Sequence, residues 1–321
     1  MGDPTFPLPF RGEGAERSEA GEGESNDRRD PDCPSPDLAF GSATLSLEGD
    51  RESARASLTA AAERFGFSAT PRLDAELLLA HALGITRERL LLTLDDRAVP
   101  PAFAELVERR TCHEPIAYIT GERAFWTIDL NVGPGVLVPR ADSETLIEAA
   151  VEHFRGTPGP RMILDLGTGP GTLLLAALAE WPEAHGVGID ASETALDYAQ
   201  RNAARLGLTD RVRLEQGDWM AGRDERCDLI LCNPPYIATG AALPPEVSDH
   251  EPAEALYAGA DGLDAYRILA PQIARALGQV ACIEIGHDQG ETAAALFRAQ
   301  GLTVALRQDL GGRDRCLVVT P

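Results

Sequence analysis

The chain has 321 residues, of which 44% are hydrophobic and 25% are charged, which is ordinary for a soluble protein with room for two domains. Its formal net charge is −22, and all 29 cationic residues are arginine. So acidic a chain is repelled by nucleic acid phosphates, which argues against a DNA partner without excluding a local basic groove. The longest apolar helix-like stretch, Thr172 to Ala179, is too short to span a bilayer, and no secretory signal is visible. We therefore expect a cytoplasmic protein with no membrane partner.

Neither the cysteines nor the histidines suggest a metal site. The six cysteines contain no C-x-x-C pair, and the six histidines lie far apart in the sequence. Three of the cysteines lie in apolar, strand-like runs, which favours buried free thiols over metal ligands. We expect no bound metal.

Residues 1–50 differ in composition from the rest of the chain. They are rich in Gly, Pro, Glu, Asp and Ser and have almost no apolar residues at regular spacing. Such a segment cannot bury enough apolar surface to offset the entropy lost on ordering. We predict a disordered acidic tail, and a start codon assigned too far upstream is the alternative interpretation.

Residues 51–117 follow helical spacing and predict a small helical bundle. On the second of its helices Leu73, Leu77, Ala80 and His81 share one side, and we interpret His81 as a core histidine rather than a ligand. The polar residues form no acid–base constellation, so we expect a substrate-recognition domain. The helices are expected around Leu58 to Phe65, from Pro71 to Gly84, from Thr86 or Arg87 to Leu94, and from Pro101 to Arg110.

The period then changes from helical to alternating. Apolar residues alternate with polar ones from Trp126 to Val132, Gly133-Pro134-Gly135 is typical of a turn, and Val136 to Val138 follows it. We predict a β-hairpin that links two domains over residues 118–140.

From Arg161 onward apolar strands alternate with amphipathic helices, which predicts an α/β domain with a doubly wound, mostly parallel seven-stranded sheet over residues 141–321. The last two strands have no helix between them and should pair antiparallel. The strands are expected at Met162–Leu166, Val187–Ile189, Val212–Glu215, Leu229–Cys232, Val280–Ile285, Thr303–Leu306 and Cys316–Val319. The helices are expected at Pro170–Glu180, Ser192–Leu206, Gly262–Leu277 and Gln289–Gln300.

A glycine-rich turn follows the first strand of this sheet. It consists of Gly167, Thr168, Gly169, Pro170 and Gly171, and such a turn lets a ligand approach the backbone closely. No G-K-[ST] follows, which argues against a phosphate-binding P-loop, and the G-x-G-x-G spacing weakens a dinucleotide interpretation. A nucleoside site and a purely structural turn both remain open on these residues alone.

The next two strand ends carry acidic and aromatic side chains. Asp190 is suited to accept two hydrogen bonds from a ribose diol, although it could equally cap the following helix. Asp218 could accept a hydrogen bond from an adenine amino group, and Trp219 could offer a flat face to the base. The alternative for this pair is an acidic turn with a partly buried tryptophan. Open α/β sheets bind ligands at the carboxyl ends of their strands, so together these ends favour a nucleoside site.

The fourth strand ends in Asn233, Pro234, Pro235 and Tyr236. The prolines have no N–H, so this surface presents acceptors, mainly the Asn233 side-chain oxygen and the Pro234 carbonyl. Two adjacent acceptors suit an –NH2 group, which Tyr236 can cover with its ring. A nucleoside beside a held –NH2 group indicates transfer onto nitrogen, and S-adenosylmethionine is the nucleoside that delivers a group without phosphates.

These residues resemble the class I methyltransferases that modify planar amide or exocyclic amine nitrogens, which have a Rossmann-like fold. Further stretches narrow the resemblance to the protein-glutamine N5-methyltransferases that act on peptide chain release factors. It covers roughly residues 55 to 320, with two small departures: Ala141-Asp142-Ser143 stands where the family often has P-D-T, and Pro170 lies in the glycine loop. The stretches are Pro115–Gly121, Gly121–Trp126, Val138–Glu144, Glu251-Pro252, Ala258-Gly259 and Asp261-Gly262.

The resemblance implies a cofactor, a substrate and a set of site residues. S-adenosylmethionine would be bound by Gly167 to Gly171, Asp190 and Trp219, with Asn233 touching both cofactor and substrate. Residues Asn233 to Tyr236 would bind the glutamine of the Gly-Gly-Gln loop of a release factor, with Asn233, Pro234 and Tyr236 as the catalytic set. We expect a monomer.

Three alternatives share parts of this pattern. A ribosomal-protein glutamine methyltransferase would have the same catalytic residues, and a DNA adenine N6-methyltransferase would have the same Asn-Pro-Pro-Tyr sequence. The net charge and the lack of a basic recognition segment argue against DNA. A non-catalytic nucleoside-binding module is the alternative from another class.

Overall fold

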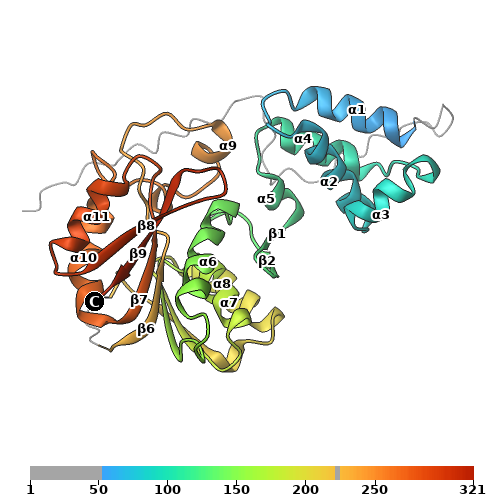
Figure 1. The fold of residues 1–321 in the computed structure, drawn as a ribbon. Coiled ribbons are helices and arrows are strands. Elements are labelled where there is room, and N and C mark those ends of the chain that lie inside the picture. Colours follow the sequence, from blue (N-terminus) through green and yellow to red (C-terminus); the bar gives the residue numbers. More distant parts are fainter. Residues whose placement is uncertain (1–52, 221–224) are drawn as a thin grey trace, which may run out of the picture.

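The computed structural model describes residues 53–220 and 225–321 (Figure 1). The acidic tail predicted for residues 1–50 lies outside the described residues. The described chain comprises a group of N-terminal helices, a short hairpin, and a seven-stranded sheet covered by helices on both faces. In the described part, no helix is both long enough and apolar enough to cross a bilayer.

The N-terminal helices pack around a hydrophobic core of their own, in which Leu58, Phe65 and Leu90 are fully buried. The four predicted helices are confirmed: Gly84 ends the second in the left-handed conformation, and the Thr86 hydroxyl caps the third. The elements are α1 (Ala54–Arg64), α2 (Pro71–Leu83), α3 (Arg87–Leu92), η1 (Leu94–Asp96), α4 (Ala102–Thr111) and α5 (Ile116–Thr120).

The side of α2 predicted to face the core is wrong at two of its four residues, whereas Ala80 is buried as expected. Leu73 and His81 are exposed, so His81 is not a core histidine, whereas Asp74 and Glu76 are buried. The physical reason is ion pairing. The buried Arg110 of α4 lies 2.9 Å from the Asp74 carboxylate, and two further arginines reach Glu76. A paired carboxylate can occupy a core position that the apolar pattern alone assigns to leucine.

The hairpin is present, but its predicted turn is wrong. Its strands are β1 (Glu122–Phe125) and β2 (Ile128–Asn131), joined by a two-residue turn that begins at Trp126 rather than at Gly133. Turns of this length favour Asn-Gly, so Trp126 with a positive φ of 54° carries no turn signal. Its backbone N–H donates to Glu144 Oε1 at 2.8 Å, a contact from a distant residue that the local pattern does not show.

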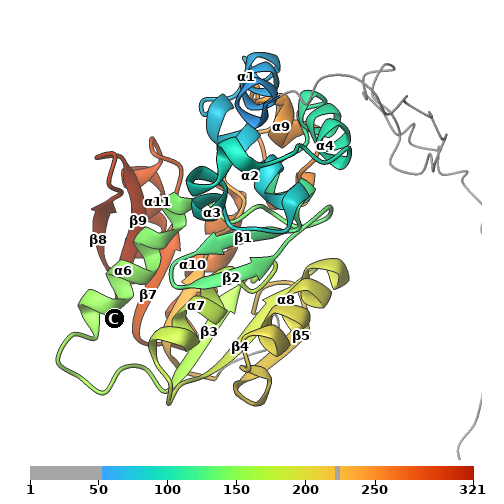
Figure 2. The same cartoon turned by 90° about the vertical axis from the view of Figure 1, so that its right-hand side faces the viewer.

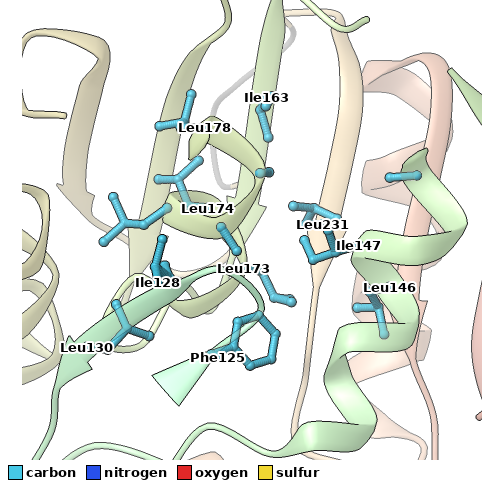
Figure 3. Close-up of a cluster of buried hydrophobic side chains, with 14 of the residues drawn as sticks. Phe125, Ile128, Leu130, Leu146, Ile147, Ile163, Leu173, Leu174, Leu178 and Leu231 are labelled. Atoms are coloured by element: carbon cyan, nitrogen blue, oxygen red, sulfur yellow. The ribbon is translucent and has the colours of Figure 1, made fainter. Parts of the chain in front are cut away.

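The hairpin packs on the core of the sheet domain. Phe125, Ile128 and Leu130 point toward the leucines of α7 (Thr172–Glu180), as Figure 3 shows, and belong to the same buried cluster. Figure 2 shows the hairpin between the N-terminal helices and α7. The buried Asn202 links the hairpin to the glycine-rich turn. Its side chain forms hydrogen bonds with the backbone of Asn131 and with the Pro170 carbonyl.

The sheet has the strand order β5-β4-β3-β6-β7-β9-β8, which confirms the predicted doubly wound, mostly parallel arrangement. β9 pairs antiparallel with both β7 and β8, as expected for the last pair, and the other strand pairs described in this sheet are parallel. The strands are β3 (Met162–Leu166), β4 (His185–Asp190), β5 (Val212–Gln216), β6 (Cys227–Cys232), β7 (Leu277–Glu284), β8 (Thr303–Gln308) and β9 (Asp314–Thr320).

Helices cover both faces of the sheet. One face packs on α6 (Glu144–His153), α7 and α8 (Glu193–Arg205), and the other packs on α10 (Asp264–Ala276) and α11 (Gly290–Arg298). The expected elements include all of these except α6. The remaining short elements are η2 (Ala141–Ser143), η3 (Thr209–Arg211), α9 (Pro245–Ser248) and η4 (Ala253–Ala255).

The packing of the hairpin predicts a large cost for truncating Phe125, whose side chain is 1% exposed. We expect Phe125→Ala to lower the free energy of unfolding by about 3–5 kcal/mol, because the substitution leaves a cavity against α7. Urea unfolding followed by circular dichroism measures this. The matched control is Leu310→Ala, at a residue that is 99% exposed, which should change stability by less than about 0.5 kcal/mol. Equal effects of the two substitutions would contradict the packing described.

Candidate active site

The parallel strands of the sheet end level with one another. Leu166 of β3 pairs with Ile189 of β4 on one side and with Cys232 of β6 on the other, and Cys232 in turn pairs with Ile283 of β7. The residues that come next in each strand therefore form a row along one edge of the sheet. From β4 to β7 these residues are Asp190, Gly167, Asn233 and Glu284.

A cavity of about 490 Å³ lies at this edge, a size typical of small-molecule sites. Its lining combines the strand ends with two segments far away in sequence, residues 135–143 and 252–255. The predicted site residues that line it are Gly167, Thr168, Gly169, Pro170, Asp190, Asp218, Trp219, Asn233 and Pro235. The predicted residues Gly171, Pro234 and Tyr236 do not line it.

The glycine loop places its backbone against the cavity. Gly167, Gly169 and Gly171 all have positive φ, which a residue with a side chain rarely adopts. A Cβ at Gly169 would meet nothing within 4 Å, whereas one at Gly171 would lie 2.7 Å from a methyl carbon of Leu175. Gly169 thus keeps the approach to the backbone open, and Gly171 allows α7 to pack closely.

Asp165, just before the loop, is a lining residue that the sequence analysis did not single out. It is 1% exposed, and its Oδ2 accepts hydrogen bonds from Thr168 Oγ1 at 2.7 Å and from the Leu174 N–H at 3.2 Å. Its Oδ1 is buried and has no hydrogen-bond partner in the described chain. Burial raises the pKa of Asp165 to about 7. An unpaired carboxylate oxygen beside a cavity is suited to a cationic ligand group.

Asp190 has the structural role at the start of the next helix that the sequence left open. Its Oδ2 accepts from the Gly169 N–H at 2.7 Å, and its Oδ1 accepts from the Ser192 N–H at 2.9 Å at the start of α8. Ser192 also caps that helix through its own hydroxyl. Each carboxylate oxygen retains a further acceptor position, so helix capping does not prevent Asp190 from binding a diol.

Trp219 and Asp218 form the end of the cavity near β5. The Trp219 ring lies over Gly167, where a Cβ would come within 3.5 Å of the ring, and its backbone has a φ of 51°. Positive φ in a bulky residue is uncommon and is often found at binding sites. Asp218 is exposed and lines the cavity.

Asn233 is held by a residue from the segment before α6. Its Nδ2 donates to Ser143 Oγ at 3.2 Å, so the Ser143 contact orients the amide and leaves Oδ1 as an acceptor. Tyr236 points elsewhere: its hydroxyl donates to Glu284 Oε1 at 3.3 Å, and its ring packs on the cluster that contains α10 and α11. Neither Ser143 nor Glu284 was predicted as a site residue from the sequence.

A second feature that the sequence did not reveal is an ion pair at the wall of the cavity. Arg140 lines the cavity and forms an ion pair with the buried Glu251, which also accepts a hydrogen bond from the Val138 N–H at 3.4 Å. Burial raises the pKa of Glu251. This pair joins residues 135–143 to the segment that contains Pro252 and Glu254. The stretches around Arg140 and Glu251 are among those that resemble the family, and this was the sequence signal from which the two residues could have been found.

The described residues contain no group of three or more His, Cys, Asp and Glu side chains placed to hold a metal ion. Cys232, Cys282 and Cys316 are buried free thiols in the sheet, and Cys227 is a buried cysteine of β6. The polar groups at the cavity are thus the backbone of the glycine loop, several carboxylates, the Asn233 amide and Arg140.

Burial of Asp165 predicts a measurable pH dependence of stability. Because its pKa is raised to about 7, the folded state keeps a proton that the unfolded chain releases near pH 4, and this contribution to stability falls as the pH rises from about 4 to about 7. Asp165→Asn removes the titration and keeps an acceptor for Thr168 and Leu174. The variant should be more stable than the parent at pH 8, with a smaller difference at pH 5.

Asp228→Asn is the matched control for this measurement. Although partial burial opposes it, hydrogen bonds from the Arg161 N–H and Gln279 hold the pKa of Asp228 below its usual range. This carboxyl is therefore ionised at both pH values, and its loss should change stability equally at each. Urea unfolding at pH 5 and pH 8 provides the comparison, and a pH-independent effect of Asp165→Asn would contradict the assignment.

Comparison with known proteins identifies the family. Residues 53–121 match the family described as PrmC N-terminal domain, and residues 161–279 match the family described as Methyltransferase domain. The release factor glutamine methyltransferase of Rhodospirillum rubrum is 46% identical over 77% of this chain and 78% of its own. Those of Caulobacter vibrioides and Mycolicibacterium smegmatis are 44% and 39% identical, over 77% and 84% of this chain and 89% and 95% of their own. The chain belongs to the release factor glutamine methyltransferase family.

Proposed function

We propose that this enzyme transfers a methyl group from S-adenosylmethionine to the side-chain nitrogen of the glutamine in the Gly-Gly-Gln loop of a peptide chain release factor. One observation carries the proposal: the Asn233 amide, oriented by Ser143, stands beside a cavity whose other residues suit a nucleoside. Family membership supports the same reaction, because the relatives are named for it.

The residues of the cavity fit S-adenosylmethionine. The open face of Gly169 admits a ligand against the backbone, and the unpaired Asp165 Oδ1 suits the ammonium group of the methionine part. Asp190 would accept from the ribose hydroxyls, Asp218 from the adenine amino group, and Trp219 would pack on the base. Gly167, Thr168 and Pro170 complete the wall, while Gly171 contributes through the packing of α7.

We propose that Asn233 and Pro234 form the acceptor clamp for the glutamine. The Asn233 Oδ1 and the Pro234 carbonyl would accept the two hydrogens of the glutamine –NH2 group. Pro235, which lines the cavity, and Tyr236 would fix the planar amide from the side. Neither Pro234 nor Tyr236 lines the cavity itself, so their contacts with the substrate are less direct than those of Asn233 and Pro235.

The bound cofactor supplies an electrophilic methyl group on a sulfonium. The chain need not deprotonate the amide first. Instead Asn233 and Pro234 orient the nitrogen toward the methyl group. As positive charge develops on the nitrogen, the two fixed acceptors stabilise it, and the proton leaves after transfer.

The N-terminal helices are proposed to recognise the release factor. We place the recognition domain at residues 51–117, the hairpin linker at 118–140 and the methyltransferase domain at 141–321. Arg110 of α4 supports this arrangement, since it donates to Glu246 Oε2 at 3.1 Å in the segment that continues into the cavity wall at Pro252. We further propose that the enzyme acts in the cytoplasm as a monomer, with no DNA substrate.

The clamp predicts a defined kinetic effect for Asn233→Ala. Removal of one preorganised acceptor should lower kcat by about 10²–10³-fold, because the developing charge loses its partner. The affinity for S-adenosylmethionine should stay within a few fold, since the glycine loop, Asp190 and Trp219 remain. Steady-state methyl transfer and calorimetry measure the two quantities. Near-normal turnover in this variant would rule out the clamp.

The substrate assignment is tested with labelled S-adenosylmethionine and a purified release factor. Label should enter the release factor and should be absent from a matched release factor in which the glutamine of Gly-Gly-Gln is replaced by alanine. A purified ribosomal protein fraction and adenine-containing DNA serve as parallel acceptors. Preferred labelling of either one would replace this assignment, and absence of transfer to every acceptor would favour a non-catalytic nucleoside-binding module.

A further inference from the structure

Glu284 is a buried carboxylate beside the clamp that the proposed reaction does not use directly. It follows Ile283, which pairs in register with Cys232, so Glu284 and Asn233 are neighbours in the row of strand ends. Glu284 is 1% exposed. Its Oε1 accepts from the Tyr236 hydroxyl at 3.3 Å, and its Oε2 has no hydrogen-bond partner in the described chain.

Ser143 connects this carboxylate to the Asn233 amide. Its hydroxyl oxygen accepts the hydrogen bond from Asn233 Nδ2 at 3.2 Å, so its own hydrogen is free to donate elsewhere. Ser143 lies near enough to the Glu284 carboxylate to lower its pKa, although Oε2 accepts no hydrogen bond within the described chain. The unpaired Oε2 is the acceptor that such a donor requires.

An asparagine amide fits its site in two orientations that exchange the oxygen and the nitrogen. Only the orientation with Nδ2 toward Ser143 leaves Oδ1 for a substrate –NH2 group. An ionised carboxylate can only accept hydrogen bonds, so it would direct the Ser143 hydrogen toward itself and the Ser143 lone pair toward Asn233. A protonated carboxyl can donate to Ser143, which frees Ser143 to donate to Asn233 and so permits the reversed amide.

We propose that Glu284 is a positioning residue which, through the Ser143 hydroxyl, keeps the Asn233 amide oxygen turned toward the substrate glutamine. This inference rests on the proposed methyl transfer to glutamine and assigns to that site a residue that controls it. The active form is the one in which Glu284 is ionised.

The surroundings of Glu284 place its titration in an accessible range. Burial raises the pKa of Glu284 to about 7, while Ser143, Arg315 and Tyr236 lower it and Asp142 raises it. From the adjacent strands and helix, the buried Cys232, Cys316 and Tyr266 also face it, and burial raises the pKa of each well above 7. Glu284 is therefore the group in this cluster that changes charge near neutral pH.

The test is kcat against pH between 5.5 and 9, at saturating S-adenosylmethionine and release factor. The parent enzyme should lose activity as the pH falls through about 7, because protonation of Glu284 removes the constraint on Asn233. Saturation matters because Asp165 also titrates near 7 and would alter cofactor affinity rather than kcat. A flat profile in the parent enzyme would overturn the inference.

Glu284→Gln and Ser143→Ala break the connection between Glu284 and Asn233, the first at its start and the second in its middle. Each should lower kcat about tenfold at pH 8, since a charge-assisted hydrogen bond is replaced by a neutral one or by none, and each should abolish the acid limb. The affinity for S-adenosylmethionine should be unchanged. Glu251→Gln removes another buried glutamate near the cavity and should retain the acid limb. An acid limb in Glu284→Gln or Ser143→Ala, or its loss in Glu251→Gln, would contradict the assignment.

A readout without activity separates this inference from the proposed function. The side-chain amide resonance of Asn233, followed by NMR in the intact chain, should shift with pH as Glu284 titrates, and Ser143→Ala should remove that shift. This titration is expected even if the release factor is not the substrate. An Asn233 resonance that is insensitive to pH in the parent protein would overturn the link, and its persistence in Ser143→Ala would exclude Ser143 as the connection.

Discussion

The site depends on the register of the parallel strands. Because Leu166, Ile189, Cys232 and Ile283 pair level with one another, the residues that follow them meet at one edge of the sheet. A shift of one residue in any strand would turn its side chains to the opposite face and remove its contribution to the edge. The buried clusters on the two faces, packed on helices, stabilise this register.

A second layer of contacts fixes the direction of the polar groups at that edge. Gly169 is tied to Asp190, and Asn233 is tied to Ser143, each through a hydrogen bond between segments distant in sequence. The Arg140 and Glu251 pair joins the two segments of the cavity wall that are distant in sequence. These contacts reduce the freedom of the site before a ligand arrives, and preorganisation of this kind is a main source of catalytic power.

Much of the fold follows from local sequence patterns, and the site follows in part. The strand from Met162 to Leu166 and the glycine loop can be predicted, because each depends on residue types that lie next to one another in the sequence. The buried face of α2 cannot be predicted in this way, because Asp74 is buried in a hydrogen bond with Arg110, which lies 36 residues away in the sequence. The Trp126 turn likewise depends on Glu144, whose side chain accepts from its backbone.

Some site residues were not predicted from the sequence for the same physical reason, which is that their contacts join residues distant in the chain. Ser143 lies 90 residues from Asn233, and nothing around either residue indicates that they touch. Glu284 ends an apolar strand and looks like an ordinary strand terminus until the register places it beside Asn233. The substrate was inferred from the family resemblance. The residues of the site by themselves indicate only that the acceptor carries a planar –NH2 group.

The most direct measurement is a structure of the enzyme with S-adenosylhomocysteine and a peptide that contains Gly-Gly-Gln. The account predicts the glutamine nitrogen at about 2.8–3.2 Å from both Asn233 Oδ1 and the Pro234 carbonyl, with Asn233 Nδ2 still bonded to Ser143. A glutamine bound away from Asn233, or an Asn233 amide with its nitrogen toward the substrate, would contradict the account.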